Sequence, residues 1–275
     1  MSSSSSSSSN NNLEINVASL NIASAKRDEK GAFPLYKRLP HLKKFIAKCV
    51  TDASIKILCI QEIRPTGELT AIQVVREIHD ALGPTWEFSD LKVNPSDNSF
   101  HRAIFWDSTV YSHLNTTGIR TANTREPHFP YLFTVSQFTK VNSLTTEPLF
   151  EVVNAHAPMI LDERIDHWTQ VREAMKPYTI VLGDFNKFAD TPGLVEYDAL
   201  FNTDPVRDFV PRDVPTFMGF EGDVDANGNL WNGSLDTVAV NTDRFDAEVI
   251  VVPTTQTPRV SDHFLITAKI TYKNQ

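Results

Sequence analysis

Residues 178–186 read YTIVLGDFN, a hydrophobic run that ends in a glycine, a carboxylate, an aromatic ring and an amide. An apolar run bounded by polar turn residues predicts a buried β-strand. Asp184 and Asn186 are ordinary turn formers, because both side chains hydrogen-bond readily to nearby backbone. Taken alone, the stretch fits a strand-ending turn and a functional site at the end of a strand equally well.

Polar residues stand at the ends of hydrophobic strands throughout this chain. Polar groups at buried strand ends cost free energy unless they are satisfied, and the loops at one edge of a sheet are where sites are built. Six such stretches contain only carboxylates, amides and imidazoles, which is more than turns explain. Beside Asp184 and Asn186, the residues are Asn21, Glu62, Asn154, His156, Asp236, Asp262 and His263.

These residue types indicate a particular chemistry. Carboxylate and amide oxygens suit a hard cation such as Mg²⁺ or Mn²⁺. Histidines can donate to a phosphoryl oxygen whose charge grows in the transition state, and a carboxylate can orient or deprotonate a water. The sequence has no Gly-rich Walker loop and no Gly-x-Ser-x-Gly elbow. The set therefore predicts metal-assisted hydrolysis of a phosphoester.

Composition narrows the class of protein. Hydrophobic residues make up 41% and charged residues 22%, as in a soluble globular protein. The net charge of −8 is not the basic footprint of a protein that grips many nucleic-acid phosphates, although a bound metal can reverse the local field. Cys49 and Cys59 form no zinc or disulfide pattern. No transmembrane stretch or secretory signal is visible, which favours an intracellular protein.

The chain is predicted to have a short tail and one folded domain. Residues 1–12 are a Ser/Asn-rich tract that buries no apolar surface, so we expect a disordered tail followed by a single domain over 13–275. Many strands with a few covering helices predict one layered α/β domain. Helices are predicted over 34–50, 68–82 and 162–175, and strands over 13–22, 55–63, 102–107, 131–141, 149–158, 179–184, 236–240, 245–252 and 263–272.

An ordered set of short motifs runs along the chain: SLN (19–21), QE (61–62), REP (125–127), NAH (154–156), GDFN (183–186), LD (235–236) and SDH (261–263). In content and order it resembles the endonuclease/exonuclease/phosphatase superfamily, from about Leu13 to Tyr272. The resemblance implies a four-layer α/β sandwich, in which two packed mixed β-sheets are flanked by helices. It also implies a catalytic domain that hydrolyses phosphoesters with Mg²⁺, or with Mn²⁺ in its place.

The resemblance assigns a metal site and a substrate side. It places Asn21 and Glu62 at the metal, with Glu62 as the direct carboxylate ligand and Asp262 beside them. Arg125 falls in a motif that often lies near the substrate phosphate, although an Arg before a Pro on an ordinary loop explains it equally well.

The catalytic roles follow from the same resemblance. Asp184 activates or orients the attacking water, and Asn186 positions that water and the phosphate. His263 stabilises the transition state, and Asp236 accepts its other N–H. His156 contacts the phosphate from the opposite side.

Several features leave alternatives open. His101 stands where deoxyribonuclease-like members carry a Glu that orients the first histidine, so how His156 is held is not determined. The aromatic side chains of Phe217, Phe220 and Trp231 either line a base or lipid pocket or pack in the core, and core packing is favoured. Residues 223–230 match the start of a calcium loop but lack its final Glu, so a plain turn is favoured.

We expect a monomeric metal-dependent phosphodiesterase, most simply a nuclease acting on nucleic acid. The alternatives are a phosphatase or a sphingomyelinase-like lipid phosphodiesterase on the same fold. A catalytically inactive binding module is disfavoured, because Glu62, Asp184, Asp236 and His263 are all retained. The sequence determines neither the substrate nor the choice between endo and exo cleavage.

Overall fold

The fold was analysed in a computed structural model of the whole chain. It describes residues 13–23, 34–65, 69–90, 101–120, 132–143, 148–187, 193–219, 233–254 and 259–273.

Two mixed β-sheets form the centre of the molecule. Within the described residues, the first sheet has six strands in the order β12-β13-β1-β2-β4-β3, and the second has seven in the order β5-β6-β7-β8-β11-β10-β9. The strands of the first sheet are β1 (Glu14–Asn21), β2 (Ile57–Ile63), β3 (Trp86–Asp90), β4 (His101–Asp107), β12 (Phe245–Val252) and β13 (Leu265–Tyr272). Those of the second are β5 (Tyr111–Arg120), β6 (Leu132–Lys140), β7 (Phe150–His156), β8 (Thr179–Asp184), β9 (Asn202–Thr203), β10 (Val206–Asp208) and β11 (Asp236–Asn241).

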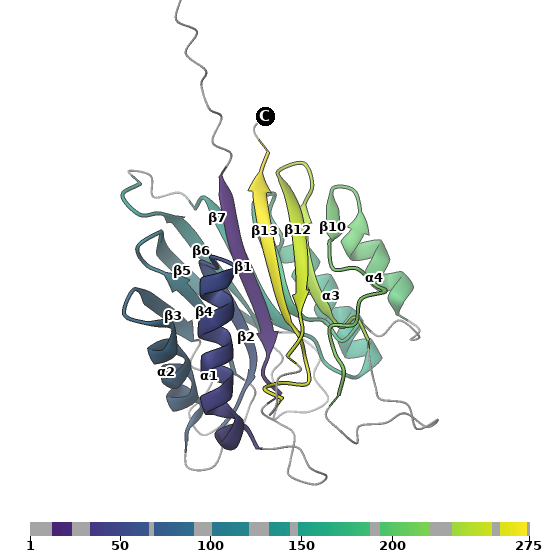
Figure 1. Ribbon diagram of the computed structural model, residues 1–275. Coiled ribbons are helices and arrows are strands. Elements are labelled where there is room, and N and C mark those ends of the chain that lie inside the picture. The colour runs from purple at the N-terminus through teal and green to yellow at the C-terminus, as the bar shows by residue number, and fades with distance from the viewer. Residues whose placement is uncertain are drawn as a thin grey trace, which may run out of the picture.

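Helices cover the outer face of each sheet (Figure 1). The helices are α1 (Leu35–Asp52), α2 (Ala71–Leu82), α3 (Leu161–Ala174) and α4 (Leu194–Phe201). Buried side chains of α1 and α2 pack on the first sheet, and those of α3 and α4 pack on the second. A third apolar cluster fills the space between the sheets. The four-layer α/β sandwich expected from the sequence is therefore confirmed.

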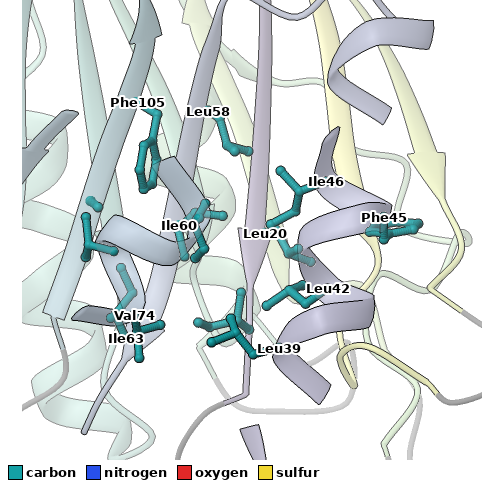
Figure 2. Packing of buried hydrophobic residues seen from close by; sticks show 14 of the residues in the cluster. Leu20, Leu39, Leu42, Phe45, Ile46, Leu58, Ile60, Ile63, Val74 and Phe105 are labelled. Carbon is teal, nitrogen blue, oxygen red and sulfur yellow. The ribbon is translucent and has the colours of Figure 1, made fainter. Parts of the chain in front are cut away.

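The two-sided burial of the central strands explains their nearly continuous apolar sequence. In β2, Ile57 and Cys59 point between the sheets, whereas Leu58 and Ile60 pack under α1 and α2 (Figure 2). Successive side chains of a strand point to opposite faces, so a strand covered on both faces must be apolar at every position.

Strand direction brings the polar strand ends to one edge. Strand β1 runs parallel to β2, and β7 runs parallel to β8, with His156 opposite Asp184. Strand β11 is antiparallel to β8, so its first residue, Asp236, also pairs with Asp184. The residues just before β13 reach the same edge, because β13 runs antiparallel to β1.

The predicted helices and strands are present, with ends that differ by a few residues. Sequence patterns did not predict β3, β5, α4 or the short pair β9–β10. Strand β5 reads YSHLNTTGIR, with a glycine and several polar residues, and α4 has only eight residues. No helix in the described part of the chain is long and apolar enough to cross a membrane.

Candidate active site

One carboxylate oxygen of Asp184 is the centre of the polar cluster. Asn21 donates from Nδ2 to Asp184 Oδ2 at 2.9 Å. His156 Nε2 lies 3.6 Å from the same oxygen, and His263 Nε2 lies 3.5 Å from it. These residues come from three different strand ends and the loop before β13. The structure thus brings together four residues that the sequence singled out, Asn21, His156, Asp184 and His263, and their roles stay predictions.

Glu62 reaches the cluster through an unusual backbone conformation. Its φ of 58° lies in the left-handed region, and the pairing of β2 with β4 shifts register between Ile60 and Ile63. Such an irregularity re-aims a side chain that regular alternation would direct elsewhere. Glu62 Oε1 accepts a hydrogen bond from Asn21 Nδ2 at 3.0 Å and lies 3.7 Å from His156 Nε2.

His263 is held from two sides. Its Nδ1 lies 3.1 Å from Asp236 Oδ2, and the Asp236 side chain is fully buried. The ring of Phe217 contacts the imidazole edge-on, with 5.0 Å between ring centroids. Phe217 is only 8% exposed and packs against the histidine, and its part in binding a substrate stays a prediction.

The pKa values of the two histidines are shifted in opposite directions. Burial lowers the pKa of His156 well below its ordinary value of 6.5, and the nearby Arg102 lowers the pKa further. Burial would also lower the pKa of His263, but the charges of Asp236 and Asp184 outweigh it and raise the pKa to about 10. At neutral pH the cluster therefore contains one neutral imidazole and one imidazolium.

The carboxylates are destabilised in their charged forms. Burial raises the pKa of Glu62, and the charge of Asp262 raises it further. Burial also raises the pKa of Asp184 to about 7, although the charge of His263 counteracts this. Asp262 is 3% exposed, so the cluster holds several acidic groups with little access to water.

Comparison with known proteins identifies the fold. No protein-family model and no curated protein matches the chain. An endonuclease/exonuclease/phosphatase family protein from Bacteroides thetaiotaomicron superposes with a TM-score of 0.69 at 17% identity, over 95% of this chain and 96% of that one. The chain has the endonuclease/exonuclease/phosphatase fold.

Proteins that share this endonuclease/exonuclease/phosphatase fold differ in what they act on. A mannosyl-6-phosphatase from Bacteroides thetaiotaomicron matches with a TM-score of 0.66 at 18% identity, over 93% of this chain and 99% of that one. TDP2 of D. rerio, complexed with a single-strand DNA product, matches with a TM-score of 0.67 at 13% identity, over 94% and 98%. Similarity at this level establishes the fold alone.

Among the residues that the structure describes, two groups are close enough to hold a metal ion. One comprises Glu62, His156 and Asp184, and the other comprises Asp184, Asp236 and His263. In the first group, Asn21 links both carboxylates through its amide nitrogen, while its oxygen accepts from Ala23 N at 2.9 Å. Buried carboxylates with raised pKa values fit a hard divalent cation, whose charge would offset their mutual repulsion.

Several arginines that surround the cluster were not among the residues predicted from the sequence. Arg38 of α1 is buried and donates to the carbonyls of Ile22, Ala23 and Val260, which flank Asn21 and Asp262. Arg102 donates to the carbonyl of His156 at 3.1 Å. Arg64 is close enough for its charge to act on Glu62 and His156. The sequence did contain a signal for Arg38, because this charged residue lies on the apolar face of its helix, between Leu35 and Leu42.

Some predicted residues lie outside the described part of the chain. They are Arg125, Phe220, Trp231 and the 223–230 loop. The 1–12 tail also lies outside it. His101 begins β4 opposite Ile63, but its side chain is not among those described, so the question of its role stays open.

His167 gives a pH-dependent stability prediction. This α3 residue is fully buried beside Phe133, and neither ring nitrogen has a hydrogen-bond partner within the described residues. Burial lowers the pKa of His167 from 6.5 to about 3. Between about pH 6.5 and pH 3, His167 is therefore protonated in the unfolded chain and neutral in the folded chain. The free energy of unfolding falls as the pH drops through this range.

We expect His167→Met to remove this acid penalty. The substitution changes the free energy of unfolding, and this change should be about 2 kcal/mol more stabilising at pH 5 than at pH 8. The reason is that each pH unit below 6.5 costs the wild type about 1.4 kcal/mol. Urea denaturation of both proteins at the two pH values measures the difference. An equal effect of the substitution at pH 5 and pH 8 would contradict the expectation.

Proposed function

We propose that this protein is a divalent-metal-dependent phosphodiesterase that hydrolyses phosphodiester bonds of nucleic acid. The observation that carries the proposal is the convergence on Asp184 Oδ2 of one neutral and one protonated imidazole. A general base flanked by two such groups suits attack on a phosphoryl group, because the base takes a proton while charge grows on the phosphoryl oxygens.

Each residue has a distinct role in this reaction. Asp184 accepts a proton from the attacking water, whose oxygen forms the new bond to phosphorus as the bond to the leaving oxygen breaks. The imidazolium of His263 donates to a non-bridging oxygen, and Asp236 holds its ring. The neutral His156 binds the phosphate from the other side. Asn186 offers its amide to the water and the phosphate.

A cation at Glu62 completes the proposed site. We place Mg²⁺ there, with Mn²⁺ as a substitute, held by Glu62 and by Asp262 directly or through water, with Asn21 orienting the carboxylates. When bound, the cation supplies Lewis-acid stabilisation of the phosphoryl oxygens. The like-charged, buried acids around Glu62 support this placement.

Nucleic acid is the proposed substrate because a protein of the same fold, TDP2 of D. rerio, is complexed with a single-strand DNA product. The net charge of −8 disfavours tight non-specific binding to duplex DNA, so single strands, RNA and oligonucleotide ends are the better candidates. The test is hydrolysis of a panel: duplex and single-stranded DNA, RNA, poly(A), sphingomyelin, phosphorylated inositols and a sugar 6-phosphate, each with Mg²⁺ or EDTA. Turnover of phosphomonoesters or sphingomyelin alone would overturn the nuclease proposal.

Metal dependence is tested most directly at Glu62. We expect Glu62→Gln to weaken Mg²⁺ binding by at least about tenfold, because a charged oxygen ligand is lost, without unfolding the protein. Titration calorimetry with Mg²⁺ and thermal melting provide the measurements. Glu248→Gln, at an exposed position of β12, is the matched control and should bind Mg²⁺ like the wild type. Full turnover of the wild type in EDTA would contradict the metal requirement.

A further inference from the structure

The GDFN loop is held in an uncommon conformation. Gly183 has a φ of 142°, and Asn186 has a φ of 48°, in the left-handed region. Asn186 N donates to Asp184 Oδ1 at 2.9 Å, and Asn186 Nδ2 donates to the carbonyl of Ala157 at 2.7 Å. Asn adopts a positive φ more readily than most non-glycine residues, but only as one of several accessible conformations, so contacts with its surroundings must select it. The geometry of Asp184 and Asn186 therefore depends on what grips this loop.

Helix α3 grips the loop from outside the cluster. Arg164 donates from Nη1 to the carbonyl of Asn186 at 2.7 Å. One turn further along the helix, Trp168 donates from Nε1 to the carbonyl of Phe185 at 3.0 Å. The two donors thus hold consecutive carbonyl groups of the loop, and the guanidinium of Arg164 also lies over the Trp168 ring, 5.5 Å from its centroid.

Burial makes Arg164 an unusual choice for this contact. The residue is only 3% exposed, so its charge is largely removed from water, at a cost that a neutral donor would avoid. Its charge is close enough to Asp184 to interact with it. A positive group behind the proposed general base favours the carboxylate form, while the charge-assisted hydrogen bond from Nη1 holds the carbonyl of Asn186 in place.

We propose that Arg164 is a positioning residue for the hydrolytic reaction, acting through the Asn186 carbonyl, with Trp168 as its partner on the same helix. The inference rests on the proposed function. Arg164 touches neither substrate nor metal in this scheme. It holds the water-activating carboxylate of Asp184 and the amide of Asn186 in the positions that the reaction requires.

The same helix provides a matched control. Arg172 donates from Nε to the carbonyl of Leu200 in α4 at 3.1 Å, so it too joins α3 to a main-chain carbonyl, but away from the cluster. If both arginines only stabilise the fold, Arg164→Met and Arg172→Met should resemble each other in activity. If the two variants are equally stable, a lower kcat in Arg164→Met than in Arg172→Met measures the contribution of positioning.

The experiment combines kinetics with hydrogen exchange. We expect Arg164→Met to lower kcat about 10–100-fold, as for other residues that orient catalytic groups, with a much smaller change in KM. Arg164→Lys, which keeps the charge and one donor, should recover part of the loss. Amide exchange of a peptide covering 183–187 should accelerate in Arg164→Met and stay unchanged in Arg172→Met.

Trp168→Phe gives a second variant in case Arg164→Met does not fold. It removes the N–H donor and keeps an aromatic ring, and should accelerate exchange in the same peptide and lower kcat several-fold. Faster amide exchange with a wild-type kcat would overturn the positioning role. Unchanged amide exchange would show that the hydrogen bonds from α3 do not hold the loop. A wild type that hydrolyses no ester in the panel would refute the proposed function, and hydrogen exchange would still decide whether α3 holds the loop.

Discussion

We expect His263→Ala to lower kcat by about 10²–10³-fold, with a smaller effect on KM, by analogy with the loss of one oxyanion donor. The imidazolium of His263 donates where charge develops, so its contribution is greatest in the transition state. Its raised pKa, about 10, keeps it protonated at neutral pH. Steady-state kinetics on a substrate found in the panel measures the effect, and circular dichroism confirms folding.

Asp236, the hydrogen-bond partner of His263, gives a second test of the same proposal. Asp236→Asn should also be severe, because the amide neither stabilises the imidazolium nor enforces one ring orientation. The two side chains are 3.1 Å apart and buried, so they should act as one unit. The double variant should then be little worse than the worse single variant. Fully additive losses would break the proposed pair, and near-wild-type kcat in folded His263→Ala would remove His263 from the mechanism.

Gly183→Ala should have the largest effect on folding. A Cβ at this position would lie 2.0 Å from the main-chain carbonyl oxygen of Ala155 on the paired strand β7. Neither atom can rotate away, because the Cβ position is fixed by the backbone and the carbonyl belongs to a paired strand. The φ of 142° adds strain for any residue with a Cβ. We expect a loss of roughly 4 kcal/mol, combining overpacking and backbone strain.

Gly83 separates the two contributions to this loss. It also has a positive φ, 100°, but a Cβ there would meet nothing within 4 Å. Gly83→Ala should therefore cost only the strain, about 1–2 kcal/mol. Urea denaturation of the two variants gives the comparison. Equal losses would show that the contact with Ala155 relaxes, and that the glycine of GDFN is needed for its conformation alone.

The main elements of the fold could be predicted from local patterns. The apolar run ILCI in β2 was recognisable because a strand buried on both faces is apolar throughout. The face of α1 formed by Leu39, Leu42, Phe45 and Ile46 was recognisable because burial of one helix face imposes a period of 3.6. Strand β5 and helix α4 were missed. Strand β5 pairs with the next strand, β6, and α4 packs on the second sheet, but the residues of both elements carry a weak local signal.

The candidate cluster was also partly predictable. Asn21, Glu62, His156, Asp184, Asp236 and His263 were selected by residue type, by their position at strand ends and by a family resemblance. The structure brings them to one edge, because parallel and antiparallel pairing direct those ends to the same side. Their roles in catalysis stay predictions.

The sequence by itself determined which residue types meet and at which strand ends, because hydrophobic periodicity and motif order are local properties. Only the tertiary structure decided that His156 is neutral while His263 is charged, since the two differ in the groups that surround them. It also decided that Arg164, on helix α3, donates a hydrogen bond to the carbonyl of Asn186. The physical reason is that charge state and hydrogen-bond partners depend on distances between segments far apart in the chain, which no local pattern encodes.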